Sequence, residues 1–157
     1  MHNAELFGRV ALAALLGGII GWERYARGQY AGDRTFALVA IGAASFTALG
    51  VDSFPITAEK LIAGIITGIG FIGGGLLIRS QGGVVRGLTT STAIWAVAAV
   101  AVLAGAGDLV FATAVAALVL LVLELRYIPI LNRLDASHWV DRGRNDDDLN
   151  PPRPDQM

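Results

Sequence analysis

The sequence predicts an all-α membrane protein, a transmembrane bundle of about five helices. Of its 157 residues, 54% are hydrophobic and 16% are charged, whereas soluble domains carry about 45–50% apolar and about 25% charged residues. The apolar residues also gather in charge-free stretches, most of them close to the roughly 17–25 residues that a helix needs to cross a bilayer. Both observations argue against a soluble enzyme.

Five apolar stretches account for the predicted spans. The first covers residues 10–22 and extends to Leu6 across Arg9. The other four cover residues 35–51, 61–78, 87–107 and 109–123. The last is short and crosses a bilayer only barely. Gly105-Ala106-Gly107-Asp108 is typical of a tight turn between the last two stretches, which favours five spans over a four-span alternative in which the two merge or one is re-entrant.

Composition divides the chain into three parts. Residues 1–125 form the predicted transmembrane domain. Residues 126–140 contain apolar positions around Ile130 and Leu134 and end near Trp139, a pattern typical of a short interfacial helix. Residues 141–157 are polar, which predicts a disordered tail, with partner binding by that tail as the alternative.

The residue inventory excludes several kinds of site. There is no cysteine, so no disulfide or thiolate chemistry is expected. His2 and His138 lie near opposite ends, which excludes histidine-based zinc motifs, and Lys60, the single lysine, has no phosphate-binding loop around it. A net charge of −1 gives no reason to expect a nucleic-acid partner. We predict no cofactor, metal site or catalytic residue, and Glu5 near the start argues against a cleaved signal peptide.

The basic residues predict the orientation. Most of the 12 Lys and Arg lie in segments that five spans place on one face of the membrane. These are Arg24, Arg27, Arg34, Arg79, Arg86, Arg126, Arg133, Arg142, Arg144 and Arg153. Only Arg9 and Lys60 are left for the other face. Because basic loops stay in the cytoplasm, we expect the amino terminus outside and the carboxyl terminus in the cytoplasm.

Glycines at helical spacing predict close helix packing. They are Gly17 and Gly21 in the first span, and Gly64, Gly68 and Gly75 in the third. Small residues four or seven apart let helices approach closely in lipid. We interpret them as packing within the chain, with an interface to a second copy or to another membrane protein as the alternative. The GxGxxG pattern at 68–73 lies inside an apolar stretch, so it is no dinucleotide site.

Charged and hydroxyl residues are predicted to gather at the cytoplasmic ends of the spans. The charged ones are Glu23, Arg24, Asp33, Arg34, Arg79 and Arg86. They are interpreted as topology anchors, with a charge network, a lipid-headgroup site or a docking face as alternatives. The hydroxyl run at 89–92 either caps a helix or helps to bind a phosphate-like anion.

No acidic residue lies near the middle of a predicted span. Intramembrane carboxylates are what proton and cation pathways usually need. An ion path through this chain would therefore have to use backbone carbonyls or the hydroxyls of Thr67, Thr47 and Ser45, and this lowers our expectation of a cation transporter.

Four ordered motifs carry a resemblance to a known family. They are GIIGWER at 18–24, AGDRT at 31–35, GIGFIGGG at 68–75 and VRGLTTSTAIW at 85–95. Together they resemble the membrane domain of the MgtC/SapB family, over about residues 8–125. The characteristic residues of that family fall on Glu23, Arg24, Gly32, Arg34, Thr35, Gly68, Gly70, Arg86, Gly87, Leu88, Thr89, Thr90 and Trp95. The chain departs from the family at Asp33, where relatives often have an apolar residue, and at 91–93, which replaces a more alanine-rich run.

The resemblance implies a multi-pass protein of the bacterial inner membrane, linked to magnesium homeostasis and, in pathogens, to survival inside host cells. Some relatives are described as magnesium transporters, and others as binding membrane partners such as the ATP synthase or magnesium-transporting P-type ATPases. Many carry a cytoplasmic ACT-like domain, which residues 126–157 are too few to build. We favour a non-enzymatic regulator that packs against a membrane partner. A homodimer is also possible from the glycine faces. The alternatives are a transporter or channel component for Mg²⁺ or another cation, and a structural membrane module.

Overall fold

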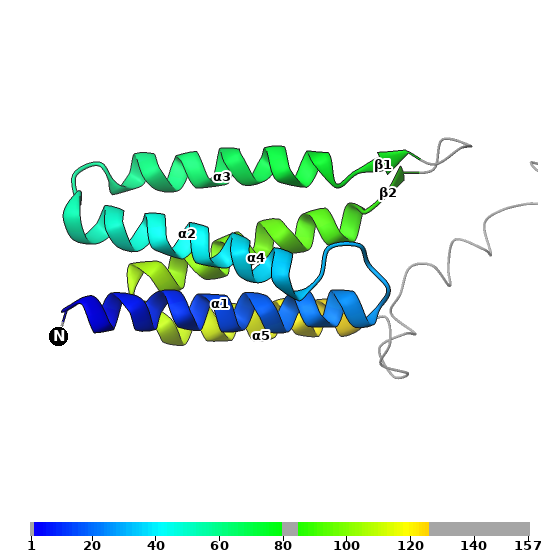
Figure 1. Cartoon of the computed structure of the whole chain (residues 1–157), viewed down its shortest axis with the longest axis horizontal. Coiled ribbons are helices and arrows are strands. Elements are labelled where there is room, and N and C mark those ends of the chain that lie inside the picture. The colour runs from blue at the N-terminus through cyan, green and yellow to red at the C-terminus, as the bar shows by residue number, and fades with distance from the viewer. Residues whose placement is uncertain (1, 80–84, 126–157) are drawn as a thin grey trace, which may run out of the picture. The chain divides into compact units, whose positions relative to one another are not determined.

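A computed structural model describes residues 2–79 and 85–125 (Figure 1). The helices in these ranges are α1 (His2–Ala26), α2 (Asp33–Ser53), α3 (Ala58–Gly75), α4 (Leu88–Ala106) and α5 (Leu109–Glu124). Two short antiparallel strands, β1 (Ile78–Arg79) and β2 (Val85–Arg86), pair between α3 and α4. The all-α prediction is confirmed, with this small hairpin as an addition. The predicted interfacial helix at 126–140 and tail at 141–157 lie outside the described residues.

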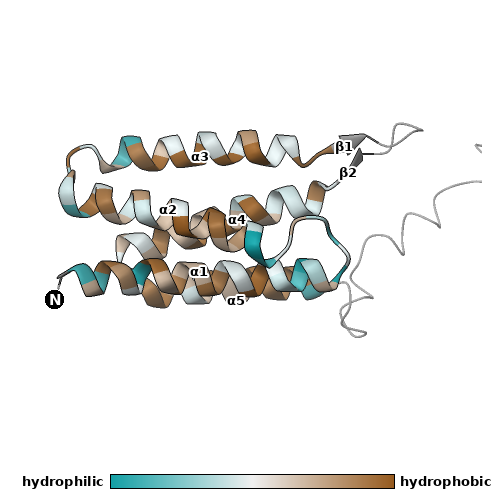
Figure 2. Ribbon diagram, viewed as in Figure 1, coloured by the Kyte–Doolittle hydropathy of each residue, from teal (hydrophilic) through white to brown (hydrophobic). Residues whose placement is uncertain are grey.

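Four of the helices, α1 to α4, are long and apolar enough to cross a membrane. Figure 2 shows hydrophobic residues along their lengths and hydrophilic residues mainly towards their ends. Helix α5 has 16 residues, which at 1.5 Å per residue is about 24 Å, shorter than the roughly 30 Å hydrocarbon core of a bilayer. Four candidate spans and one shorter apolar helix therefore stand where five spans were predicted. A fifth crossing by α5 stays a prediction.

The core lies where α1, α2 and α4 pack against one another. Its largest fully buried side chains are Phe36, Ile20, Ile94, Val97, Val100 and Thr47, and most of its other members are alanines. Small residues allow the backbones to approach. A methyl group added at Gly105 of α4 would lie 2.5 Å from the carbonyl oxygen of Ala44 in α2. By contrast, α3 buries only Ile69 and Gly73 and runs along the edge of this core (Figure 1).

Two glycine turns define the ends of α1 and α4. Gly28 follows α1 with a φ of +73°, and the N–H of Gln29 donates to the carbonyl of Arg24 over 3.0 Å. Gly107 follows α4 with a φ of +97°, and the Asp108 carboxylate accepts the Phe111 N–H over 3.2 Å at the start of α5. Glycine adopts the left-handed conformation without the steric penalty of other residues. The predicted turn between the fourth and fifth apolar stretches is confirmed.

Candidate functional site at the arginine-rich end

Helix α1 ends in a buried ion pair. Glu23 and Arg24 are only 6% and 5% exposed, and the guanidinium of Arg24 donates through Nε and Nη2 to the two carboxylate oxygens of Glu23. One turn later, Arg27 places its Nε 3.5 Å from Glu23 Oε1. Removing charges from water is costly unless they are paired and hydrogen-bonded. Each member of the pair therefore makes burial of the other tolerable.

A polar contact ties the loop after α1 to the start of α4. Thr90 is 4% exposed, and its hydroxyl donates to the side-chain oxygen of Gln29 over 3.0 Å. Because the backbone N–H of Gln29 also bonds to Arg24, the loop is connected to the buried ion pair on one side and to α4 on the other. We call Glu23, Arg24, Gln29 and Thr90 the polar junction.

The start of α4 is also joined to the end of α3. Gly87 has a φ of +91°, and a methyl group there would lie 2.5 Å from the carbonyl oxygen of Leu76. The Ser91 hydroxyl donates to the carbonyl of Gly73 over 2.8 Å. Only a glycine fits the conformation and the space at position 87.

The interpretation of the hydroxyl run as a helix cap is wrong. The N-cap of α4 is Gly87, without a side-chain cap hydrogen bond. Thr92 donates to the carbonyls of Leu88 and Thr89, while Thr90 and Ser91 donate to other elements. These hydroxyls are used as donors to oxygen atoms, whereas a cap accepts from N–H groups. The anion-site alternative stays a prediction, since the side chains of Arg79 and Arg86 lie outside the described part.

The start of α2 packs closely on α1 at the same end. A methyl group added at Gly21 would lie 2.7 Å from the carbonyl oxygen of Gly32, and one added at Gly32 would lie 3.1 Å from Tyr25 Cβ. Gly17, one turn before Gly21, would place a methyl group 2.8 Å from Ala40 Cβ. Both predicted packing glycines of α1 therefore lie in the contact with α2.

The third-span glycines behave differently. Among the described residues, no atom outside the local turn of α3 lies within 4 Å of a methyl group built at Gly64, Gly68 or Gly75, and the same holds for Gly70 and Gly74. The interpretation that Gly64, Gly68 and Gly75 pack within the chain is therefore wrong. Their alternative role, an interface with another chain, stays a prediction.

The structure brings some predicted site residues together and separates others. Glu23, Arg24, Gly32, Gly87 and Thr90 gather at the arginine-rich end, as described above. Asp33, Arg34, Leu88 and Thr89 are exposed at the same end, and Thr35 is half-buried. Trp95 lies two turns along α4 and is 54% exposed. Gly68 and Gly70 lie in the middle of α3, away from the polar junction.

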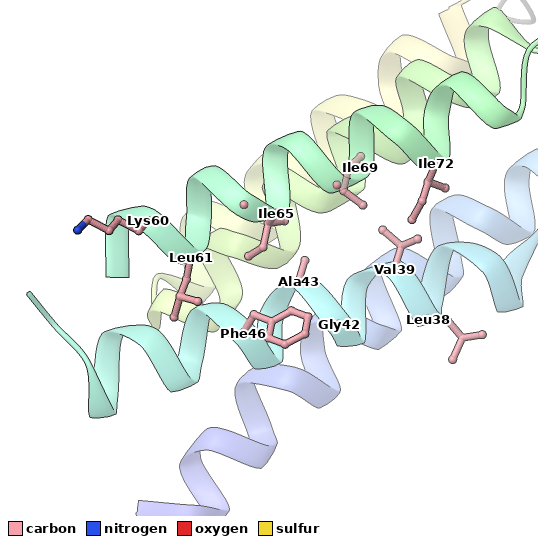
Figure 3. A pocket seen from close by; sticks show the side chains of 12 residues that line it. Leu38, Val39, Gly42, Ala43, Phe46, Lys60, Leu61, Ile65, Ile69 and Ile72 are labelled. Carbon is pink, nitrogen blue, oxygen red and sulfur yellow. The ribbon is translucent and has the colours of Figure 1, made fainter. Parts of the chain in front are cut away.

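An apolar groove runs between α2 and α3 (Figure 3). It has a volume of about 580 Å³, and Gly42, Gly64 and Gly68 contribute to its lining along with aliphatic side chains and Phe46. Lys60 lies at one end, with its ammonium pointing away from the groove (Figure 3). Two of the uncovered glycines of α3, Gly64 and Gly68, thus border a hollow on the surface of the bundle.

Sequence reasoning missed two polar residues with structural roles. Gln29 joins the polar junction, and the glycine after Arg27 was the signal for a helix end that places it. Arg9 forms an ion pair with Glu5 and donates from Nη1 to the carbonyl of Gly105 over 3.5 Å. A cation is favourable at the carboxyl end of a helix, and the interruption of an apolar stretch by Arg9 was the available signal.

The hydroxyls named for an ion path have local roles. Thr47 donates to the carbonyl of Ala43 over 2.8 Å, and Thr67 donates to that of Ala63 over 3.0 Å. Ser45 is exposed. Within ranges 2–79 and 85–125, no three His, Cys, Asp or Glu residues come together as metal ligands.

Comparison with known proteins places this fold in a family. The model of the MgtC family matches residues 10–128. Proteins named Protein MgtC from Brucella abortus (strain 2308) and Salmonella typhimurium (strain LT2) are 42% identical over 130 residues and 43% identical over 109 residues, covering 80% and 69% of this chain. The aligned parts cover 52% and 46% of those relatives, so the chain spans about half the length of the curated relatives it matches. No solved structure matches. The chain belongs to the MgtC family.

Proposed function

We propose that this protein is a multi-pass protein of the bacterial inner membrane that supports magnesium homeostasis by binding a membrane partner complex through α3. The observation that carries the proposal is the uncovered glycine face of α3, formed by Gly64, Gly68 and Gly75. A glycine inside a helix costs about 1 kcal/mol relative to alanine, and nothing in the described part of the chain needs the missing side chains. Close approach by a helix of another protein supplies the reason.

The position of α3 supports the same proposal. Within the described part of this chain, the helix buries only Ile69 and Gly73 and accepts one hydrogen bond from Ser91. Gly64 and Gly68 border the apolar groove with α2, which extends the surface that a partner helix would contact. Van der Waals packing of small residues is a principal source of helix association in lipid.

The link to magnesium rests on family membership and on the resemblance described above. That resemblance implies the ATP synthase or a P-type ATPase as the class of partner. The relatives are about twice as long as the matched region. A role for this chain in magnesium homeostasis is therefore part of the proposal.

Site-specific photocrosslinking in cells tests the proposed surface. A photoreactive amino acid at Phe71, which is 87% exposed and lies one turn after Gly68 on α3, is expected to capture a membrane protein of the ATP synthase or P-type ATPase class, identified by mass spectrometry. The matched control is the same group at Leu118, an exposed position of α5 that is 58% exposed, where lipid adducts are expected. Adducts to lipid alone at both positions would contradict the proposal.

A flux measurement separates binding from transport. The purified protein in liposomes is expected to leave the Mg²⁺ permeability of the membrane unchanged across an imposed gradient. A flux that depends on the protein and falls in Thr67→Val would instead assign a cation transporter, with the exposed α3 hydroxyl on the path.

A further inference from the structure

A second, smaller groove lies on the surface of α1 and α2. It has a volume of about 340 Å³ and is lined by Ala14, Leu15, Gly18, Ile19, Trp22 and Asp33. Four of these residues are apolar or glycine, while Trp22 and Asp33 lie towards the arginine-rich end. We propose that this groove binds phosphatidylethanolamine, with the ammonium group at Asp33 and Trp22 and the upper part of one acyl chain along α1.

Asp33 supplies the charge that selects the headgroup. The residue is exposed, and the cap of α2 is Gly32, with no side-chain cap hydrogen bond. Among the described residues, none forms a hydrogen bond or ion pair with the Asp33 carboxylate. Its backbone is fixed beside α1, because a methyl group at Gly21 would lie 2.8 Å from Asp33 Cα. The carboxylate is therefore placed next to the turn that carries Trp22 and is available to an external cation.

Trp22 and Asp33 together favour a primary ammonium. Trp22 is 65% exposed, and the face of an indole ring attracts cations. A carboxylate gains a charge-assisted hydrogen bond from the N–H groups of ethanolamine. The trimethylammonium of phosphatidylcholine has no N–H to donate, and phosphatidylglycerol has no cation at all. Among these three headgroups, ethanolamine satisfies both side chains.

The depth of the site also fits a headgroup. Trp22, Tyr25 and Tyr30 are 65%, 67% and 92% exposed, and exposed Trp and Tyr are enriched at the membrane interface. The exposed Arg34 follows Asp33 directly and offers a positive charge to the lipid phosphate. At about 30 Å³ for a water-sized group, the groove holds roughly ten methylene-sized groups. This inference rests on insertion into a bilayer, not on partner binding through α3.

Fluorescence quenching by brominated lipids tests the site. The chain has three Trp, so a Trp95→Phe, Trp139→Phe variant leaves Trp22 as the reporter. Vesicles contain equal mole fractions of lipid brominated in the upper acyl chain, carrying an ethanolamine, choline or glycerol headgroup, in the same unlabelled background. We expect the ethanolamine lipid to be enriched at Trp22 about threefold to fivefold over the choline lipid, the range for one exposed charge-assisted contact.

Two controls separate the site from the bulk bilayer. Asp33→Asn in the same background is expected to abolish the ethanolamine preference, whereas Glu59→Gln, an exposed acidic position at the start of α3, is expected to keep it. With Trp95 as the only tryptophan, equal quenching by the ethanolamine and choline lipids is expected. Circular dichroism confirms that each variant keeps its helices.

Three results would overturn the proposal. These are equal quenching of Trp22 by the ethanolamine and choline lipids, stronger quenching by the glycerol lipid, and a preference that survives Asp33→Asn. The first two results come from a chain with Asp33 intact. They therefore test the proposed lipid site even if the Asp33→Asn variant fails to fold.

Discussion

At the scale of single residues, the end of α1 depends on charges that compensate each other. Glu23 and Arg24 are adjacent in sequence and buried together. The sequence placed them at a cytoplasmic rim, where exposed anchors were expected. It did not predict their burial, because burial depends on tertiary packing around the end of α1, where Gln29 bonds both to Arg24 and to the distant Thr90.

Replacing one partner of this pair is expected to destabilise the protein strongly. Glu23→Gln leaves the Arg24 guanidinium buried without a counter-charge, so we expect a loss of about 3–5 kcal/mol in the free energy of unfolding. Arg34→Gln, at an exposed arginine of the same end, is expected to change it by less than about 0.5 kcal/mol. Unfolding in mild detergent, followed by circular dichroism, measures both. Equal stability of Glu23→Gln and the unsubstituted chain would show that the pair does not support the fold.

A second prediction for a single residue concerns Gly87. Gly87→Ala forces a side chain into a left-handed conformation, at a cost of about 1–2 kcal/mol, and towards the Leu76 carbonyl. We expect a lower midpoint of thermal unfolding. Gly70→Ala, where a methyl group meets nothing, is expected to leave the midpoint unchanged or raise it. The reverse order of the two midpoints would contradict the account.

At the scale of elements, the helices and the α4–α5 turn could be predicted because they depend on local sequence. Charge-free stretches lie close to the bounds of α2, α4 and α5, whereas α1 extends beyond its stretch at both ends, and Gly107 with Asp108 forms the turn. The packing partners of glycines could not be predicted, because the same four-residue spacing occurs on α1, against α2, and on the uncovered face of α3. The Thr90–Gln29 hydrogen bond joins residues 61 positions apart, so no local sequence pattern predicts it.

The two glycine faces are expected to respond oppositely to the same substitution. Gly17→Leu drives a side chain into α2, because even a methyl group would lie 2.8 Å from Ala40 Cβ, and overpacking typically costs about 1–3 kcal/mol or more. A methyl group built at Gly68 lies within 4 Å of no other described residue, and the groove beside it has room for a longer side chain, so we expect Gly68→Leu to keep the fold but to lose crosslinking to the membrane partner. Thermal unfolding and the crosslinking experiment separate the two effects. A strongly destabilised Gly68→Leu would mean that α3 packs differently.

At the scale of the whole molecule, the proposed function requires the helices to cross a bilayer with the arginine-rich end in the cytoplasm. Four candidate spans support the crossing. The orientation follows from the positive-inside rule and stays a prediction. The orientation determines which leaflet supplies the lipid at Asp33. It also determines on which side of the membrane the polar junction lies.

Single-cysteine labelling tests this central claim most directly, because the chain contains no cysteine of its own. Tyr30→Cys lies at the arginine-rich end and Ile56→Cys in the opposite loop, at positions that are 92% and 91% exposed. In intact spheroplasts, a membrane-impermeant maleimide is expected to label Ile56→Cys at once, and Tyr30→Cys only after the membrane is opened. Labelling of Tyr30→Cys in intact spheroplasts, or recovery of the chain from the aqueous fraction without detergent, would contradict the account.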